Sequence, residues 1–143
     1  MEGYPNQRLM KEWIYSDITP EIANWAESFG KFLTRSEEEE RKPLTTGQIR
    51  KFFGEVKRIG ANVEANKADI IILKPLLAYA VGRDKNNRGD NKTKIKDFEE
   101  EMRTALSAIR FDKNLVSDFK HFEQLFEAIV AYHKFYGGKE NNN

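Results

Sequence analysis

Apolar residues recur at intervals of three and four along five segments of the chain, which is the spacing of amphipathic helices. No segment of useful length alternates apolar and polar residues as a half-buried strand does. We therefore expect an all-α fold, a compact bundle of about five or six helices. The expected helices span residues 19–34, 45–62, 67–83, 95–109 and 115–136.

Capping residues mark several of these helix ends. Thr19 followed by Pro20 is typical of a helix start, because threonine caps and proline fits the first turn. Thr45 and Gln48 have the spacing of a capping box, which predicts that the second helix begins there. The pair at 137–138, two glycines, is expected to end the last helix.

The third helical segment, residues 67–83, is apolar on nearly every side. A helix of that kind is expected in the middle of a bundle. Pro75 is expected to kink it or to split it in two. Residues 69–73 are rich in β-branched side chains and could form a buried strand, but no partner strand is available in the sequence.

The second helical segment, residues 45–62, separates into two opposed faces. One face carries an apolar stripe, which consists of Ile49, Phe52, Phe53, Val56 and Ile59 and continues to Val63. The other face is basic and consists of Arg50, Lys51, Lys57 and Arg58. Gly54 and Ala61 lie in the middle of the basic face, which leaves a flat, positive surface that suits the backbone of a polyanion.

The length of 143 residues predicts one core, with an N-terminal extension marked off by composition. Residues 1–43 are expected to form this extension, with one helix and an acidic linker that includes four consecutive glutamates at 37–40. Residues 44–138 are expected to form the main helical bundle, and residues 139–143 a frayed tail.

Composition excludes several classes of function. The chain has no cysteine, so disulfide scaffolds and cysteine-based zinc or nucleophile chemistry are excluded. The formal net charge is only +1, so nucleic-acid binding would require segregated charge. The start of the chain lacks a secretory pattern, and the longest apolar run, residues 70–73, is too short to cross a bilayer. We expect a cytoplasmic protein that needs no cofactor.

The chain offers little material for catalysis. His121 and His133 are twelve residues apart on one expected helix, about 18 Å along its axis, so they cannot share a metal ion. We expect His133 to face inward and to be hydrogen-bonded, and His121 to be solvated. The carboxylates at 99–101 point in different directions on a helix, and we expect them to form an acidic outer stripe. A further set of cations stands near segment ends and consists of Lys74, Arg83, Lys85, Arg88 and Lys134, and Phe135 points away from the inward stripe of its helix.

Three separated blocks of sequence resemble a known family. They are Leu-Thr-Thr-Gly-Gln-Ile-Arg-Lys-Phe-Phe at 44–53, Leu-Lys-Pro-Leu-Leu-Ala-Tyr-Ala-Val-Gly-Arg at 73–83 and Phe-Glu-Ala-Ile-Val-Ala-Tyr-His-Lys-Phe-Tyr-Gly-Gly at 126–138. In order and spacing they resemble the small subunit of the type III-A CRISPR effector, the Csm complex. The resemblance covers about residues 44–138, and residues 1–43 carry no pattern of this family.

The resemblance implies a small helical bundle without catalytic activity. Several copies would stack beside the filament of backbone subunits, near the large subunit, and line the duplex of guide RNA and target RNA. Contact would be made through basic residues, and the phosphates of the duplex are the expected partners. The candidate RNA-binding residues are Arg50, Lys51, Lys57, Arg58, Arg83 and Lys134.

Two other functions compete with this one. A freestanding protein-interaction bundle would carry the same basic face merely as solvated charge, and a salt-dependent measurement of RNA binding would distinguish it. A metal-dependent nuclease would use His121 or His133 with nearby carboxylates. Metal-dependent cleavage abolished by a single histidine substitution would identify the nuclease, which ranks last because no convergent ligand set can be drawn.

Overall fold

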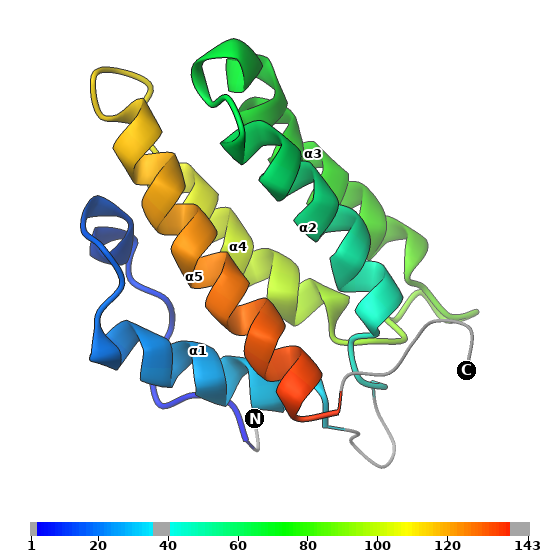
Figure 1. Ribbon diagram of the computed structural model, residues 1–143. Coiled ribbons are helices and arrows are strands. Elements are labelled where there is room, and N and C mark those ends of the chain that lie inside the picture. Colours follow the sequence, from blue (N-terminus) through cyan, green and yellow to red (C-terminus); the bar gives the residue numbers. More distant parts are fainter. Residues whose placement is uncertain (1–2, 36–40, 138–143) are drawn as a thin grey trace.

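Five α-helices and two short 3₁₀ helices (η) make up the regular structure of residues 3–35 and 41–137, the parts of the chain that the computed structural model describes (Figure 1). Within those ranges there is no strand, only two isolated bridges. The expectation of an all-α bundle is therefore confirmed. The elements are η1 (Lys11–Tyr15), α1 (Pro20–Leu33), α2 (Thr46–Gly60), η2 (Glu64–Asn66), α3 (Lys67–Arg83), α4 (Ile95–Ala108) and α5 (Leu115–Phe135).

The helix ends follow the local signals in the sequence. The Thr19 hydroxyl accepts a hydrogen bond from the Ile22 amide at 3.2 Å. The capping box at the start of α2 is complete, because the Gln48 amide donates to the Thr45 hydroxyl at 3.1 Å and the Thr45 amide donates to the Gln48 side chain at 2.8 Å. Gly137 follows α5 with φ of +96°, a conformation that favours glycine and ends the helix.

The helices form three layers (Figure 1). The middle layer consists of α4 and α5. On one side of it, α1 packs along α5, and η1 contacts both α4 and α5. On the other side, α2 packs on α5 and α3 packs on α4. The two outer layers therefore lie on opposite faces of the α4–α5 pair.

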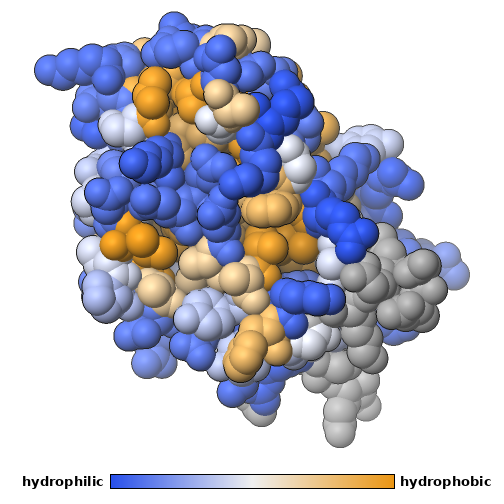
Figure 2. Space-filling view, in the orientation of Figure 1, coloured by the Kyte–Doolittle hydropathy of each residue, from blue (hydrophilic) through white to orange (hydrophobic). Residues whose placement is uncertain are grey.

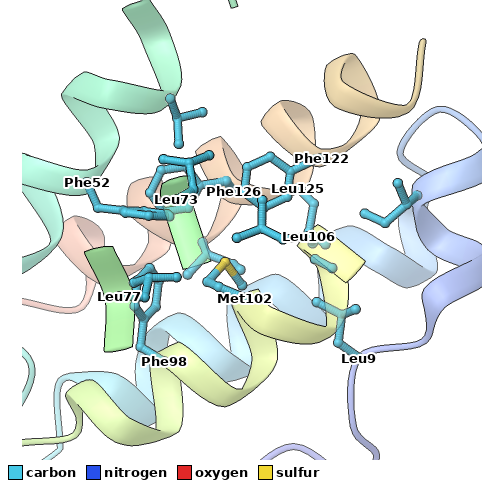
Figure 3. Close-up of a cluster of buried hydrophobic side chains, with 14 of the residues drawn as sticks. Leu9, Phe52, Leu73, Leu77, Phe98, Met102, Leu106, Phe122, Leu125 and Phe126 are labelled. Atoms are coloured by element: carbon cyan, nitrogen blue, oxygen red, sulfur yellow. The ribbon is translucent and has the colours of Figure 1, made fainter. Parts of the chain in front are cut away.

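Phe126 on α5 lies at the centre of the core and is fully buried. Its ring centroid lies 5.4 Å from that of Phe52 on α2, 5.9 Å from Phe98 on α4 and 6.0 Å from Phe122 one turn earlier on α5. Figure 3 shows Phe126 in the cluster that these rings form with Met102 and with leucines of α3, α4 and α5. Edge-to-face and tilted ring contacts thus join three helices.

Residues before and after position 43 belong to the same buried cluster. Trp13, Phe29 and Leu33 are members of it, and so are Phe98 and Phe126. No break in the core accompanies position 43, and a separate N-terminal unit stays a prediction. The glutamates at 37–40 and the expected tail at 139–143 lie outside the described residues.

The acidic triplet at 99–101 does not form an outer stripe, and that expectation was wrong. Glu99 and Glu101 are buried, and only Glu100 is partly exposed. Glu101 accepts hydrogen bonds from the Leu9 amide at 3.2 Å, from Arg8 Nε at 2.8 Å and from the Tyr4 hydroxyl. The N-terminal segment covers this face of α4, and the buried carboxylate satisfies the amide that would otherwise lie in the core without an acceptor.

Helix α3 does not lie in the middle of the bundle, which corrects a second expectation. Only Ile70, Leu73 and Leu77 are buried, because α3 is the outer partner of α4 and α2. The helix also continues through Pro75 instead of splitting there. Four large apolar side chains remain exposed on it: Ile71, Ile72, Leu76 and Tyr79.

The two histidines differ in how well they were predicted. His133 is buried as expected, and its Nε2 lies 2.6 Å from the Leu44 carbonyl, so Nε2 carries the proton and donates it. His121 was expected in solvent, but η1 covers it, and its Nδ1 lies 2.8 Å from the Ile14 carbonyl. Burial lowers the pKa of His133 because the charged imidazolium loses its hydration.

The lowered pKa of His133 makes stability depend on pH. In the unfolded chain a histidine takes up a proton near pH 6.5, whereas buried His133 takes one up only at lower pH. The free energy of unfolding should therefore decrease as pH falls below about 6.5, by up to about 1.4 kcal/mol per pH unit. His133→Gln keeps a donor for Leu44 and should flatten this part of the curve in urea denaturation. A His133→Gln variant that retains the slope of the parent would contradict the assignment.

Burial also separates two phenylalanines that the sequence placed on inward stripes. Phe126→Ala should reduce the free energy of unfolding by about 3–5 kcal/mol, because the ring is fully buried among other rings. Phe53 is half-buried and packs against Phe126 at a centroid distance of 5.7 Å, so Phe53→Ala should cost clearly less. Exposed Lys51→Ala should stay within about 0.5 kcal/mol in the same denaturation series. Equal losses for the two phenylalanines would mean that the core is centred elsewhere.

Candidate nucleic-acid interface

Two of the expected RNA-binding cations on α2 form ion pairs within the molecule. Lys57 Nζ contacts the carboxylates of Glu123, at 3.2 Å, and of Glu127, both on α5. Its hydrogen bonds to Glu127 and Glu123 raise the pKa of Lys57. A phosphate would have to displace these carboxylates before it could bind Lys57.

Arg58 is held in the same manner. Its guanidinium lies 3.1 Å from the Glu55 carboxylate one turn earlier and 3.3 Å from that of Asp69 on α3. The hydrogen bond to Glu55 is the largest cause of a raised pKa for Arg58. The second half of α2 is thus a surface of matched charges, which differs from the one-signed face that the sequence indicated.

The first half of α2 keeps the expected character. Arg50 and Lys51 are both exposed, one turn from the start of the helix. Gly54 follows on the same surface, and a Cβ added to it would meet no atom within 4 Å, so the backbone there is open to an approaching ligand. Gly60 is different, because an added Cβ would lie 2.6 Å from the Glu123 carboxylate.

The bundle topology brings the other expected cations to the end of the molecule at which α2 begins. Helices α2 and α4 begin at this end, and α3 and α5 end there (Figure 1). Arg83, the last residue of α3, has its guanidinium 5.7 Å from the Tyr79 ring centroid. Lys134 is exposed near the end of α5, beside exposed Phe135. Arg50, Lys51, Arg83 and Lys134 thus share one end, which we call the basic end.

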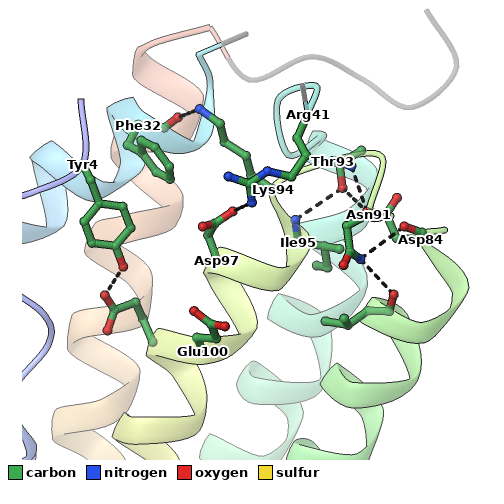
Figure 4. A network of polar contacts seen from close by, with 12 residues as sticks. Tyr4, Phe32, Arg41, Asp84, Asn91, Thr93, Lys94, Ile95, Asp97 and Glu100 are labelled. Atoms are coloured by element: carbon green, nitrogen blue, oxygen red, sulfur yellow. Dashed lines mark hydrogen bonds and ion pairs between the residues drawn. The ribbon is translucent and has the colours of Figure 1, made fainter. Parts of the chain in front are cut away.

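The loop between α3 and α4, residues 84–94, builds most of the basic end (Figure 4). Buried Asp84 accepts hydrogen bonds from the Thr93 amide and from the Thr93 hydroxyl, both at 2.9 Å. Asn91 donates to the Val81 carbonyl at 3.0 Å and to the Asp84 carbonyl at 3.2 Å. These short polar side chains satisfy the turn internally, so the loop has a defined shape.

The loop is also fastened to the rest of the fold. Lys42 pairs with it through backbone hydrogen bonds to residues 92 and 94, at 2.8 and 3.1 Å. The Gln48 side chain donates to the Thr93 hydroxyl at 3.0 Å, which links the loop to the first turn of α2. Buried Lys94 donates to the Phe32 carbonyl at 2.8 Å, which links it to the end of α1. The loop that carries the exposed cations is therefore anchored to the start of α2 and the end of α1.

A hollow of about 520 Å³ lies at this loop. Its lining consists of Arg41, Lys85, Asn86, Arg88, Gly89, Asp90, Asn91 and Lys96. Four of these residues are cations and one is an anion. Arg41 pairs with Asp97, Lys85 donates to Asn91 at 3.1 Å, and the Arg88–Asp90 pair is long, at 3.9 Å. Such a hollow can surround an anionic group of a polymer that lies across it.

The sequence indicated Lys85 and Arg88 as cations near a segment end but did not indicate the hollow, because Arg41, from a distant part of the chain, also lines it. The signal was present in composition. Residues 41–51, 83–97 and 131–137 hold eleven Lys and Arg side chains and three Asp. The ends of separate helices bring these segments together, so no single helical wheel displays them.

Within the described parts of the chain, no group of three or more His, Asp or Glu side chains is arranged to hold a metal ion. His121 and His133 contact separate backbone carbonyls, those of Ile14 and Leu44. Among the same residues, no helix combines the length and apolar character that spanning a membrane requires.

Comparison with known proteins found one family. The model of the family described as Csm2 Type III-A matches residues 19–139, whereas no curated protein and no solved structure matched the chain. The match begins at the cap of α1, so the family pattern extends further towards the N-terminus than the resemblance over residues 44–138 indicated. Because it covers most of the chain, the protein belongs to the Csm2 family and is a small subunit of the type III-A CRISPR effector, the Csm complex.

Proposed function

We propose that the protein is a non-catalytic subunit whose basic end contacts the phosphate backbone of the duplex formed by guide RNA and target RNA. The observation that supports this most strongly is the rigid α3–α4 loop, which holds Lys85 and Arg88 around a hollow together with Arg41 and Lys96. Arg50 and Lys51 extend the same positive surface along α2.

Phosphates suit this surface better than bases do. The exposed groups are charged heads on long side chains, and the hollow is open and polar. Such groups neutralise phosphates without reading sequence, which a subunit that must accept any guide requires. The phosphates of an A-form duplex are regularly spaced, so copies stacked along it would meet equivalent groups.

The contribution of each cation should follow its place and its present contacts. Lys57 and Arg58 would have to give up carboxylates at 3.1 to 3.3 Å, so their net gain from a phosphate is small. Arg50 and Lys51 lie nearer the start of α2, at the basic end where the hollow also lies. We therefore rank these two and the cations of the hollow above Lys57 and Arg58. Two further cations at the basic end, Arg83 and Lys134, are candidates of intermediate strength.

The partners in this proposal are the RNA duplex, the backbone and large subunits of the complex, and neighbouring copies of the chain, in the cytoplasm. Each copy contributes only a few phosphate contacts, so a single copy should bind RNA weakly. Several copies on one duplex would add their contacts as linked sites do.

The hollow gives a direct test. A triple variant Lys85→Ala, Arg88→Ala, Lys96→Ala should lower target-RNA affinity of the assembled complex for all sequences alike. The plot of log affinity against log salt should become flatter: the magnitude of its negative slope should decrease by about 0.9 for each phosphate that a copy of the variant no longer neutralises. Filter binding over a salt series measures both quantities.

A charge-matched control is available far from the hollow. Lys113 and Lys120 are exposed and lie on the α4–α5 loop and the first half of α5. Their double alanine variant removes the same charge as the double Lys85→Ala, Arg88→Ala and should leave the salt slope unchanged. Equal effects from these two doubles would indicate bulk electrostatics only. If neither double nor the triple variant of the hollow has an effect, the protein is an interaction bundle without RNA contact through this end.

A second comparison tests the ranking on α2. Arg50→Ala with Lys51→Ala should reduce target-RNA affinity and the magnitude of the salt slope more than Lys57→Ala with Arg58→Ala, because Arg50 and Lys51 lie at the basic end, where the hollow also lies. Both doubles remove two charges from the same helix, so each is the control for the other. A larger effect of the 57/58 double would show that the ion pairs open when RNA binds.

A further inference from the structure

The outward face of α3 is apolar and has no partner within the described parts of the chain. The exposed fractions are 60% for Ile71, 48% for Ile72, 38% for Leu76 and 63% for Tyr79. Their directions span about 140° of the helix circumference. Single exposed apolar residues are ordinary, but a continuous apolar helix face on a small protein marks an interaction surface.

The shape of this face suits a packed partner. Ala68, Pro75 and Gly82 are exposed and recur every seven residues, so they follow the middle of the face as a line of small residues. A Cβ added at Gly82 would meet no atom within 4 Å. Larger side chains flank this line, and a partner could therefore lie close to the backbone of α3 between them.

A groove adjoins the first half of the same face. It has a volume of about 160 Å³ and lies between α3 and the end of α4. Ile71 and Phe111, both at least half exposed, stand beside Ile70, Leu106 and Ile109 in its lining. Apolar cavities of about this size take up a molecule as large as benzene, so the groove can receive one apolar side chain of a partner.

Charge decides what kind of partner fits. Residues 67–83 carry three cations, Lys67, Lys74 and Arg83, and one anion, Asp69, which is engaged by Arg58 at 3.3 Å. A pairing of two α3 helices would bring three cations of one copy close to three cations of the other, with only one carboxylate on each helix. The face therefore disfavours self-pairing and fits a surface that combines apolar side chains with carboxylates.

The opposite outer layer of the same chain has that character. Met10 and Tyr15, at η1, are 39% and 41% exposed. Residues 10–21 carry three exposed carboxylates, Glu12, Asp17 and Glu21, and one lysine, Lys11. A neighbouring guanidinium, that of Arg110, lies over the Tyr15 ring and is matched by Asp118.

We infer that the apolar face of α3 binds the η1–α1 layer of a second copy, head to tail. The two layers lie on opposite faces of the α4–α5 pair, so each copy keeps one of each surface available for a neighbour (Figure 1). Contacts between unlike surfaces can repeat without closing into a dimer. The inference rests on the proposed function in that it supplies the contact by which copies stack along an RNA duplex.

Outside α3, no helix of the described residues exposes more than two large apolar side chains. Hydrophilic side chains dominate the view in Figure 2, where hydrophobic side chains form separate small patches. The remaining large exposed apolar side chains are scattered, as Val116 and Phe135 are at the two ends of α5.

Cross-linking tests the head-to-tail arrangement, because the parent chain has no cysteine. Ala78→Cys marks the exposed side of α3 and Ser16→Cys marks the end of η1. Size-tagged Ala78→Cys protein is mixed with untagged Ser16→Cys protein and treated with a short bis-maleimide, both as isolated chains at high concentration and in the assembled complex. The inference requires a mixed product in excess over either self-product. Predominant product between two Ala78→Cys chains, or no mixed product in either setting, overturns it.

A substitution series gives an independent readout. Ile72→Asp should weaken self-association more than about tenfold in sedimentation equilibrium, because it places a charge at the centre of the contact. Val116→Asp is the matched control, since Val116 is equally exposed at 48% and lies outside both surfaces. The melting temperatures of both variants should stay close to that of the parent. Unchanged self-association of Ile72→Asp overturns the inference, and reduced incorporation into the complex with unchanged self-association would assign the face to another subunit.

The two proposals can fail separately. If the triple variant of the hollow loses RNA affinity while Ile72→Asp associates like the parent, RNA contact stands and the α3 assignment falls. If the mixed cross-link forms while the parent shows no salt-dependent RNA binding, the α3 contact stands and the proposed function falls.

Discussion

The packing of aromatic rings around Phe126 is the constraint on which the other features depend. Its ring meets Phe52, Phe98 and Phe122 at centroid distances of 5.4 to 6.0 Å, so α2, α4 and α5 are positioned by one side chain. Because α5 also carries α1 on its other side, it has neighbours on both faces along its length. This arrangement assigns α4 and α5 to the middle layer and leaves the outer surfaces of α1 and α3 for other contacts.

Local signals predicted the elements well, because they act within a few residues. The capping box of Thr45 and Gln48, the cap at Thr19 and the stop at Gly137 all depend on neighbours in sequence. Burial was harder to predict where it depends on what covers a helix. The helix η1 packs on α4 and α5 and covers His121, and the residues before it, Tyr4, Arg8 and Leu9, cover Glu101.

The candidate site shows the same division. The cations of α2 are exposed as its pattern indicated, but three of the four carboxylates that pair with Lys57 and Arg58 come from α5 and α3, up to 70 residues away. A helical wheel contains no information on such partners. The apolar sequence of α3 likewise led to a wrong prediction of burial. An apolar pattern shows that a surface avoids water, but it does not show whether the same chain covers that surface.

The distribution of carboxylates explains how a chain of net charge +1 can present a positive surface. Asp84, Asp97, Glu101 and Asp118 are buried and accept hydrogen bonds from backbone amides or nearby cations. A buried carboxylate holds the fold together but cannot reach a ligand at the surface. Lys85 and Arg88 of the α3–α4 loop are exposed and line the hollow. Under the proposed function a phosphate at the hollow would interact with these cations at close range, where the local arrangement of charge outweighs the near-neutral total.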